Sequence, residues 1–239
     1  MLNPRPNYAG LSITVVVPCF NEEKTILEAL RRVRAALSGD TQIIVVDDGS
    51  TDRTLEILQR ECANLFDLVI IHEKNRGKGA ALHSGFAKAT KDLVVVQDAD
   101  MEYDPFDIPR LIGPIAAGKA DVVFGSRFLG SDARRVLLYW HSLGNKFLTT
   151  FSNMFTNLNL TDMETGYKMF RRETLQQLSL REQRFGFEPE VVARIARLNL
   201  RIYEVGISYA GRTYSEGKKI SWKDGFSAIR CILKYSVRR

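Results

Sequence analysis

The first half of the 239-residue chain alternates short apolar runs with longer segments in which apolar residues recur every three or four positions. Short continuous apolar runs are typical of buried parallel strands, and the periodic segments are typical of amphipathic helices. We predict strands at 13–17, 42–46, 68–72, 93–97 and 122–125, and helices from an Asn21 cap to a Gly39 stop and at 51–64, 79–89 and 107–117. This alternation predicts an α/β domain whose parallel sheet is covered by helices on both faces.

After about residue 130 the alternation stops, and residues 131–162 are rich in aromatic, asparagine and basic residues. This segment is too apolar to be a linker. Farther along the chain we predict helices at 188–198 and 222–237, with a strand at 202–207 between them. Because there is no internal repeat and the length suits one core, we expect a single domain over 1–239, with halves at about 12–128 and 129–239.

The charge balance points to an anionic partner. Lysine plus arginine number 34 and aspartate plus glutamate 28, a net charge of +6, which suits nucleic acid, phosphate groups or an acidic membrane surface. Charge alone does not choose among these. Many basic residues fall in the second half, at 134–135, 171–172, 218–219 and 238–239. This asymmetry favours a localised anionic contact.

The cysteines and the hydropathy of the chain indicate the cellular compartment in which we expect the protein. Cys19, Cys62 and Cys231 are far apart and lack metal-ligand spacing, which fits structural thiols in a reducing compartment. The first ten residues lack the apolar segment of a signal peptide, and no apolar run approaches the ~20 residues that span a bilayer. We therefore expect a cytoplasmic protein that is soluble or peripheral to a membrane.

Acidic residues follow the fourth predicted strand, at the sheet edge where open parallel sheets bind ligands. Asp98, Asp100 and Glu102 are spaced by two, so on an extended chain their side chains point the same way. Such carboxylates repel one another, and a bound cation removes that conflict. Oxygen ligands of this kind predict Mg²⁺ or Mn²⁺ completed by diphosphate oxygens and water. For the triplet alone, a polar turn that ends the strand is the simpler alternative.

Two other loops carry candidate binding groups. Asp47 and Asp48 precede a helix whose capping needs only one such side chain, so the surplus carboxylate suggests hydrogen bonds to a base or ribose. The glycines beside Lys78 lack the Walker spacing, and they fit an anion site and a plain helix start equally well. The three histidines show no paired metal spacing, and no Gly-x-Ser-x-Gly elbow accompanies them, which disfavours a Ser/His/Asp hydrolase.

Several motifs agree in order and spacing with one known family. The segments VVVPCFNEE, VVDDGSTDRT, NRGKGAA, QDADMEYDP and GSRF resemble the family 2 glycosyltransferases of GT-A fold over residues 12–128. The later segments DMETGYKMFRRE, RFGFEPEVVARI and YAGRTYSEGKKISWKDG are similar to the dolichyl- and polyprenyl-phosphate sugar synthases, the branch that includes dolichol-phosphate mannosyltransferase. The Gln-x-x-Arg-Trp motif of a processive polysaccharide synthase is absent from the sequence.

The resemblance implies a nucleotide-sugar site in the first half and an acceptor- and membrane-facing second half. It implies Mg²⁺ or Mn²⁺ held by Asp98, Asp100 and Glu102, and catalytic roles for Asp100, Arg127 and Asp162. It also implies that the nucleotide-diphosphate sugar is bound by Pro18, Phe20, Glu22, Asp47, Asp48, Lys78, Asp98, Ala99, Arg127, Arg212 and Lys218. Phe20 replaces the usual tyrosine, so only its stacking role carries over. The motif that holds Lys218 departs from the usual Gly-Glu-Ser-Lys at two places.

The resemblance further implies transfer of a mannose- or glucose-type hexose to a polyprenyl or dolichyl phosphate, with inversion at the anomeric carbon. A phosphate monoester with a second pKa of about 6 is largely a dianion at neutral pH, so its oxygen can attack without a general base. Asp162 is then expected to orient the site or to pair with an arginine. A hydroxyl acceptor, in polysaccharide or glycoprotein synthesis, is the alternative in which Asp162 could serve as the base.

An alternative from another class is a non-catalytic nucleotide- or nucleic-acid-binding module. Acidic residues at the strand ends would repel a nucleic-acid backbone, so we expect no nucleic-acid partner. A lipid acceptor instead requires contact with a bilayer. Residues 134–155 and the C-terminal helix both mix apolar and basic residues as interfacial helices do, although both could pack on the sheet.

We rank residues 134–155 first because this segment lies between Arg127 and Asp162 in the chain. We therefore expect a peripheral location at the cytoplasmic face of a membrane, with a membrane-anchored partner if direct attachment fails.

Overall fold

A seven-stranded sheet forms the centre of the computed structural model, which describes residues 10–130, 135–136, 138–212 and 222–237. The order is β3-β2-β1-β4-β6-β5-β7. The strands are β1 (Ile13–Cys19), β2 (Thr41–Asp47), β3 (Leu68–Ile71), β4 (Leu93–Val96), β5 (Val122–Ser126), β6 (Lys168–Arg171) and β7 (Ile202–Gly206). Every predicted strand is present close to its predicted bounds, and the mostly parallel α/β sheet is confirmed.

Strand β6 was not predicted from the sequence. It runs antiparallel between β4 and β5, with Met169 paired to Val95 on one side and to Val123 on the other. Its four residues, KMFR, begin and end with a basic residue, so no apolar run marks the strand. Because β6 comes late in the chain, it joins the second half of the sequence to the parallel strands of the first half.

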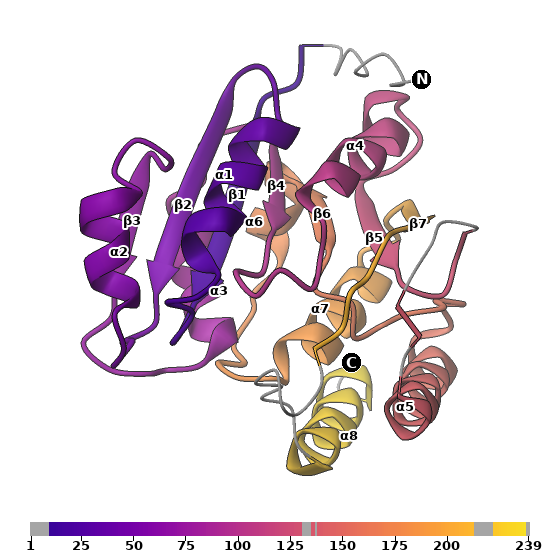
Figure 1. Cartoon of the computed structure of the whole chain (residues 1–239). Coiled ribbons are helices and arrows are strands. Elements are labelled where there is room, and N and C mark those ends of the chain that lie inside the picture. Colours follow the sequence, from indigo (N-terminus) through magenta and orange to yellow (C-terminus); the bar gives the residue numbers. More distant parts are fainter. Residues whose placement is uncertain (1–9, 131–134, 137, 213–221, 238–239) are drawn as a thin grey trace.

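Helices cover both faces of the sheet, as expected (Figure 1). On one face lie α1 (Ile26–Ala36), α2 (Thr54–Glu61) and α4 (Ile108–Ala116), which follows the 3₁₀ turn η1 (Pro105–Asp107). On the other lie α3 (Lys78–Phe86), α6 (Arg172–Gln177), α7 (Phe187–Arg197) and α8 (Trp222–Val237). Alternate strand residues serve the two cores: Val15 belongs to the first and Val16 to the second. The strands therefore read as continuous apolar runs because both of their faces are buried.

The predicted cap of the first helix is wrong. Helix α1 begins after Thr25, while Asn21 adopts a left-handed φ of 53°. The Asn21 side chain accepts a hydrogen bond from the Thr51 backbone N–H at 2.8 Å, so it ties together the loops after β1 and β2. The helix also ends earlier than predicted, at Ala36, before the turn at Gly39.

Most of the aromatic segment after β5 folds into helix α5 (Tyr139–Thr156). Helix α5 packs against α7 and α8, and α5 and α8 lie side by side at the lower right of Figure 1. None of the described helices combines the length and the apolarity needed to cross a bilayer.

Candidate active site

A cavity of about 370 Å³ opens at the carboxyl ends of β1, β2 and β4. Loops after these strands meet there because neighbouring parallel strands end at the same edge of the sheet. Of the residues predicted from the sequence, its lining includes Pro18, Phe20, Glu22, Asp48, Lys78, Asp98, Ala99 and Asp100. The structure thus brings most of the predicted donor-binding residues together.

The ammonium group of Lys78 lies between two acidic residues in this cavity. Its Nζ is 2.8 Å from Oδ1 of Asp98 and 3.5 Å from Oε1 of Glu188. Burial alone would lower the pKa of Lys78, but the charges of Asp98 and Glu188 outweigh burial and raise it. Lys78 is therefore a permanent positive charge that a phosphate entering the cavity would meet.

The glycines around Lys78 serve packing. Gly77 has a φ of 102°, and a Cβ there would lie 2.5 Å from the carbonyl oxygen of Gln183. The Gly77 N–H donates to Oδ2 of Asp48 at 2.7 Å, and the Arg76 N–H donates to Oδ1 at 3.0 Å. Because these N–H groups are already used, the capacity of this loop to bind an anion rests on the Lys78 side chain.

The two aspartates after β2 have different surroundings. Asp48 faces the cavity, and its Oδ1 is 2.6 Å from Nδ1 of the buried His72. Nε2 of His72 lies 2.9 Å from Oγ of Ser84, but Ser84 does not line the cavity, so this chain of contacts is no hydrolase site there. Asp47 is buried outside the lining and accepts a hydrogen bond from Ser50, and burial raises its pKa. Only Asp48 is therefore placed to meet a ligand in the cavity.

Arg212 and Glu102 do not line the cavity, but Arg212 neutralises acidic residues that do. Its backbone N–H donates to Oε1 of Glu102 at 2.7 Å, and Nη2 lies 3.1 Å from Oδ2 of Asp100 and 3.2 Å from Oε1 of Glu22. Burial raises the pKa of Asp100, and the negative charges of Asp98 and Glu102 add to that effect. The predicted metal ligands thus form a crowded negative site held in balance by two cations.

These residues fit a divalent metal in part. Asp98 and Asp100 line the cavity with the oxygen donors that Mg²⁺ and Mn²⁺ prefer. Glu102 is engaged on both oxygens, by the Arg212 N–H and by the Tyr209 hydroxyl at 2.6 Å. Among the described residues, no three acidic, histidine or cysteine side chains converge as a preformed metal site. Metal ligation by the triplet stays a prediction, with Asp98 and Asp100 the better placed members.

Arg127 and Asp162 form a second, buried pair outside the cavity lining. Nε of Arg127 donates to Oδ2 of Asp162 at 2.7 Å, and Nη2 donates to Oδ1 at 2.7 Å. Asn145 on α5 also donates to Asp162 Oδ1, at 3.2 Å. The guanidinium lies 5.1 Å from the centre of the Tyr209 ring, whose hydroxyl contacts Glu102. Tyr209 therefore connects this pair to the acidic triplet.

The residues of the cavity region that were missed include three from one segment. Arg184 and Phe185 line the cavity, and Glu188 contacts Lys78. All three come from RFGFEPE, a segment that matches the family motif but received no site residue. An acidic residue within an otherwise apolar helix start was the available signal. The predicted Lys218 lies outside the described residues.

A buried charged cluster from DMETGYK was also missed. Burial raises the pKa of Glu164 and lowers that of Lys168. Oε1 of Glu164 and Oε2 of Glu188 are buried without a hydrogen-bond partner. Such unsatisfied carboxylate oxygens beside the cavity are available to a ligand.

Comparisons with known proteins show the family to which the chain belongs. The family model for glycosyl transferase family 2 matches residues 14–179. The low-salt glycan biosynthesis hexosyltransferase Agl6 of Haloferax volcanii is 31% identical over 93% of this chain and 53% of that protein. An undecaprenyl-phosphate 4-deoxy-4-formamido-L-arabinose transferase of Pseudomonas aeruginosa is 31% identical over 92% of this chain and 62% of that enzyme. The chain thus spans about half of the first relative and under two thirds of the second.

Other relatives and solved structures match over more of their length. An uncharacterized glycosyltransferase of Mycobacterium tuberculosis is 33% identical over 88% of this chain and 90% of its own. The M. tuberculosis glucosyl-3-phosphoglycerate synthase in complex with Mn²⁺, UDP-glucose and phosphoglyceric acid superposes with a TM-score of 0.73 at 25% identity, over 96% of this chain and 81% of that one. The same enzyme with Mg²⁺ and UDP gives a TM-score of 0.73 at 24% identity, over 96% and 80%. The chain is therefore a glycosyltransferase of GT-A fold, and it belongs to glycosyl transferase family 2.

Proposed function

We propose that this chain transfers a mannose- or glucose-type hexose, with inversion, from a nucleotide-diphosphate sugar to a polyprenyl or dolichyl phosphate. The observation that carries the proposal is a single cavity with both kinds of charge that a metal–diphosphate complex needs. Asp98 and Asp100 supply oxygens for a cation, and Lys78 supplies positive charge for phosphates. Arg212 is not part of the cavity lining, but it contacts Asp100 and Glu22, which are, and adds a second positive charge beside them. Lys78 and Arg212 each contact a carboxylate in the structure. A metal–diphosphate complex that enters the cavity would offer its phosphates to these cations and its metal ion to the carboxylates.

Each group of residues has a role in this reaction. A bound Mg²⁺ or Mn²⁺ would stabilise the charge that develops on the departing nucleoside diphosphate. Lys78 and Arg212 add to that stabilisation by hydrogen bonding the phosphate oxygens. Pro18 and Phe20 offer an apolar wall for the nucleotide base. In our proposal Asp48, which lines the same cavity, exchanges one of its present hydrogen bonds for a hydroxyl of the ribose. An acceptor phosphate is already largely a dianion, so the site requires no general base for it.

Two features support a phosphate acceptor. The first is the likeness over most of this chain to the Pseudomonas enzyme, whose name specifies undecaprenyl phosphate. The second is Arg127, whose guanidinium Asp162 fixes in place beside Tyr209. In our proposal Arg127 attracts the acceptor phosphate, and Asp162 sets its orientation. Asp162 has both oxygens engaged, which suits this positioning role.

A hydroxyl acceptor is the second candidate, and one observation favours it. The structural relative was crystallised with phosphoglyceric acid, and Glu188 has a buried Oε2 without a hydrogen-bond partner. A hydroxyl acceptor would need such a carboxylate as a base. Glu188 fits that need better than Asp162, because Arg127 and Asn145 already contact both oxygens of Asp162.

The test is a screen of UDP- and GDP-hexoses with Mn²⁺ or Mg²⁺ against three acceptors: a short polyprenyl phosphate, the matching free polyprenol and phosphoglyceric acid. We expect product only with the polyprenyl phosphate, with inverted anomeric configuration. Equal transfer to the free polyprenol, or transfer to phosphoglyceric acid alone, would contradict the proposed acceptor. Glu188→Gln is the matched variant: we expect it to retain most transfer to the polyprenyl phosphate, whereas under the hydroxyl alternative this substitution would abolish transfer.

A lipid acceptor also bears on location. The net charge of +6 suits an anionic membrane surface, and we propose a peripheral position at the cytoplasmic face. A membrane-anchored partner is the alternative route to the same lipid.

A further inference from the structure

Helix α5 and Val136, which lies ahead of it in the chain, expose large apolar side chains that the described part of the chain does not cover. Val136 is 93% exposed, Trp140 76% and Met154 75%. We define the α5 face as the exposed apolar side chains of this segment: Val136, Tyr139, Trp140, Leu143, Phe147 and Met154. Within α5, the successive separations of three, four and seven residues from Trp140 through Leu143 and Phe147 to Met154 place these side chains along one side of the helix, with Tyr139 beside them. Val136 lies ahead of the helix.

The opposite side of α5 is the side that packs on the rest of the protein. Leu148 and Phe151 pack against the second core, and Thr149 and Ser152 are buried. The expectation that α5 simply covers the sheet is therefore correct for one side of the helix only. The α5 face has no such explanation, because core packing does not require large side chains in water.

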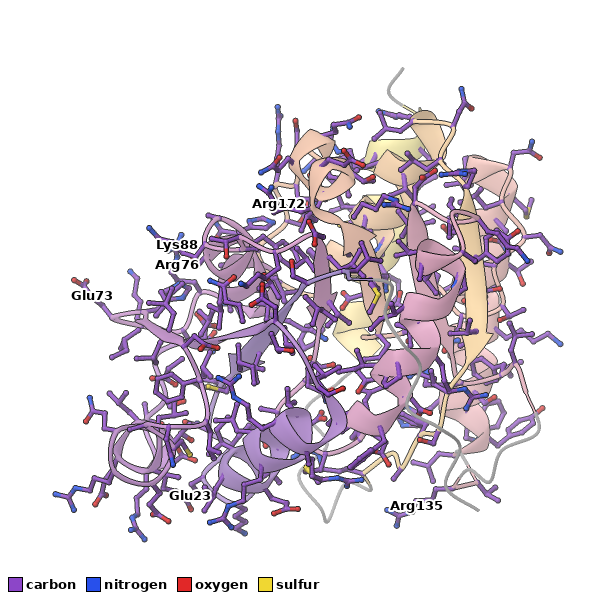
Figure 2. The ribbon with its side chains drawn as sticks, turned by 90° about the horizontal axis from the view of Figure 1, so that it is seen from above. Glu23, Glu73, Arg76, Lys88, Arg135 and Arg172 are labelled. Carbon is purple, nitrogen blue, oxygen red and sulfur yellow. The ribbon has the colours of Figure 1, made fainter. Side chains whose placement is uncertain are left out.

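The charged residues within the segment that carries the α5 face are of one sign. Residues 133–161 contain no aspartate or glutamate, whereas Arg134, Arg135 and Lys146 are basic. Arg135 and Lys146 are exposed. Figure 2 shows Arg135 at one edge of the molecule, well separated from Glu73 and Arg76 on the side that carries α3. Basic residues beside Trp, Tyr and Phe are the mix found in helices that lie in a lipid–water interface.

We propose that the α5 face docks on an anionic lipid surface. A bilayer of this kind offers acyl chains to the aromatic residues and negative headgroups to Arg135 and Lys146. A second copy of the chain fits less well: a two-fold dimer through this face would bring the same basic residues of both copies together, with no acid in 133–161 to neutralise them.

Helix α8, the other predicted membrane segment, differs from α5 in how its apolar residues are used. It buries Ala228, Cys231 and Ile232 in the protein, so most of its apolar side is used for packing. Its exposed Phe226 and Leu233 lie on a helix that packs beside α5 (Figure 1). The two predicted membrane segments therefore differ: α5 has an unpartnered apolar side, and α8 chiefly holds α5 in place.

Docking through this face would bring the membrane to a helix that also contacts the site residues. Asn145 lies on the packed side of α5, with Thr149 and Ser152, and its side chain contacts both Arg127 and Asp162. A phosphate carried by a membrane lipid would then arrive at the helix that contacts Arg127. This consequence for catalysis rests on the proposed function, whereas docking itself does not.

Flotation of the full chain with vesicles tests the proposal directly. The vesicles contain phosphatidylcholine alone or phosphatidylcholine with phosphatidylglycerol, at low and high salt. We expect binding to the anionic vesicles that weakens with salt, and a loss of about tenfold or more in Trp140→Ser/Phe147→Ser, because two large apolar side chains no longer leave water. The matched control is Ile71→Ser/Leu198→Ser, which removes two exposed apolar residues elsewhere and should bind like the original chain.

Two results would overturn docking on lipid. One is equal vesicle binding, or none, by the original chain and the Trp140→Ser/Phe147→Ser variant, both with unchanged thermal unfolding. The other is a dimer in light scattering that these substitutions dissociate while the original chain ignores vesicles, which would assign the face to a second copy.

Transfer assays separate this proposal from the proposed function. The variant should keep transfer to a short, water-soluble polyprenyl phosphate and lose transfer to a long one embedded in vesicles. If the original chain transfers to neither acceptor, the proposed function fails, and flotation still decides docking.

Discussion

Two ion pairs of the site differ in how firmly they are held. Lys78, whose side chain is 21% exposed, has two acidic neighbours, Asp98 at 2.8 Å and Glu188 at 3.5 Å. Asp162 is fully buried and receives three hydrogen bonds from one residue, Arg127. Lys78 and its acidic neighbours can therefore exchange contacts when a charged ligand enters the cavity. The Arg127–Asp162 pair instead keeps its geometry. The molecule thus separates exchangeable charge in the cavity, where we propose that the donor binds, from fixed charge at the Arg127–Asp162 pair, where we propose that the acceptor phosphate binds.

Removing the fixed pair should have the largest effect on stability. Asp162→Asn leaves the Arg127 guanidinium buried without a countercharge, and we expect the free energy of unfolding to fall by about 3–5 kcal/mol. Urea denaturation measures this loss. The matched variant is Asp98→Asn, after which Lys78 still has Glu188, and its loss should be smaller, about 1–2 kcal/mol. Similar losses in the two variants would abolish the distinction between the pairs.

Moving Lys78 without changing its charge sharpens the comparison. Gly77→Ala places a Cβ at a φ of 102°, close to Gln183 O and 2.7 Å from Cγ of Arg184. We expect a loss of about 1–3 kcal/mol in stability and weaker binding of a nucleoside diphosphate. Gly144→Ala on exposed α5 is the control, since a Cβ there meets nothing within 4 Å, and it should stabilise the chain by about 0.5–1 kcal/mol. Unchanged nucleotide affinity in Gly77→Ala would argue against a role for Lys78 in binding.

Replacing a third acidic residue, Glu182, should have a smaller effect on the free energy of unfolding, and this effect should depend on pH. Partial burial opposes ionisation of Glu182, but hydrogen bonds from Lys234 and Tyr235 and the charge of Arg230 lower its pKa from 4.5 to about 2. A folded pKa below the unfolded one means that this stabilisation is present above pH about 4.5 and is lost as the pH falls toward 2. Glu182→Gln should therefore lower the unfolding free energy by about 1–3 kcal/mol at pH 7.

Urea unfolding at several pH values checks this expectation. The difference between Glu182→Gln and the original chain should shrink steadily below pH 4. A difference that stays constant with pH would mean that shape, and not the ionised carboxylate, anchors α8 at this point.

The sequence predicted the layout of the donor cavity well, for a physical reason. Strands buried on both faces, such as β1, must be continuously apolar, so their ends and the polar loops that follow are visible in the sequence. Phe20, Asp48 and Asp100 were placed in this way and all line one cavity.

The features that could not be predicted depend on contacts that form only in the folded protein. Lys168 is fully buried in β6 because its ammonium donates to the carbonyls of Met163 and Thr165, so a basic residue stands where an apolar one would mark a strand. Arg212 meets Glu22 across 190 residues, and no periodicity reports such a pair. Asn21 follows the pattern of a cap, yet its left-handed backbone directs it to Thr51.

The central claim is that the acidic cavity binds its donor through a divalent metal. Isothermal titration of UDP and GDP into the original chain and into Asp100→Asn, with Mn²⁺ and with the metal chelated, tests it most directly. We predict binding of at least one nucleotide that requires Mn²⁺ in the original chain, and a loss of about tenfold or more in Asp100→Asn with its thermal unfolding unchanged. Equal affinity with and without metal, or equal affinity of Asp100→Asn and the original chain, would contradict the claim.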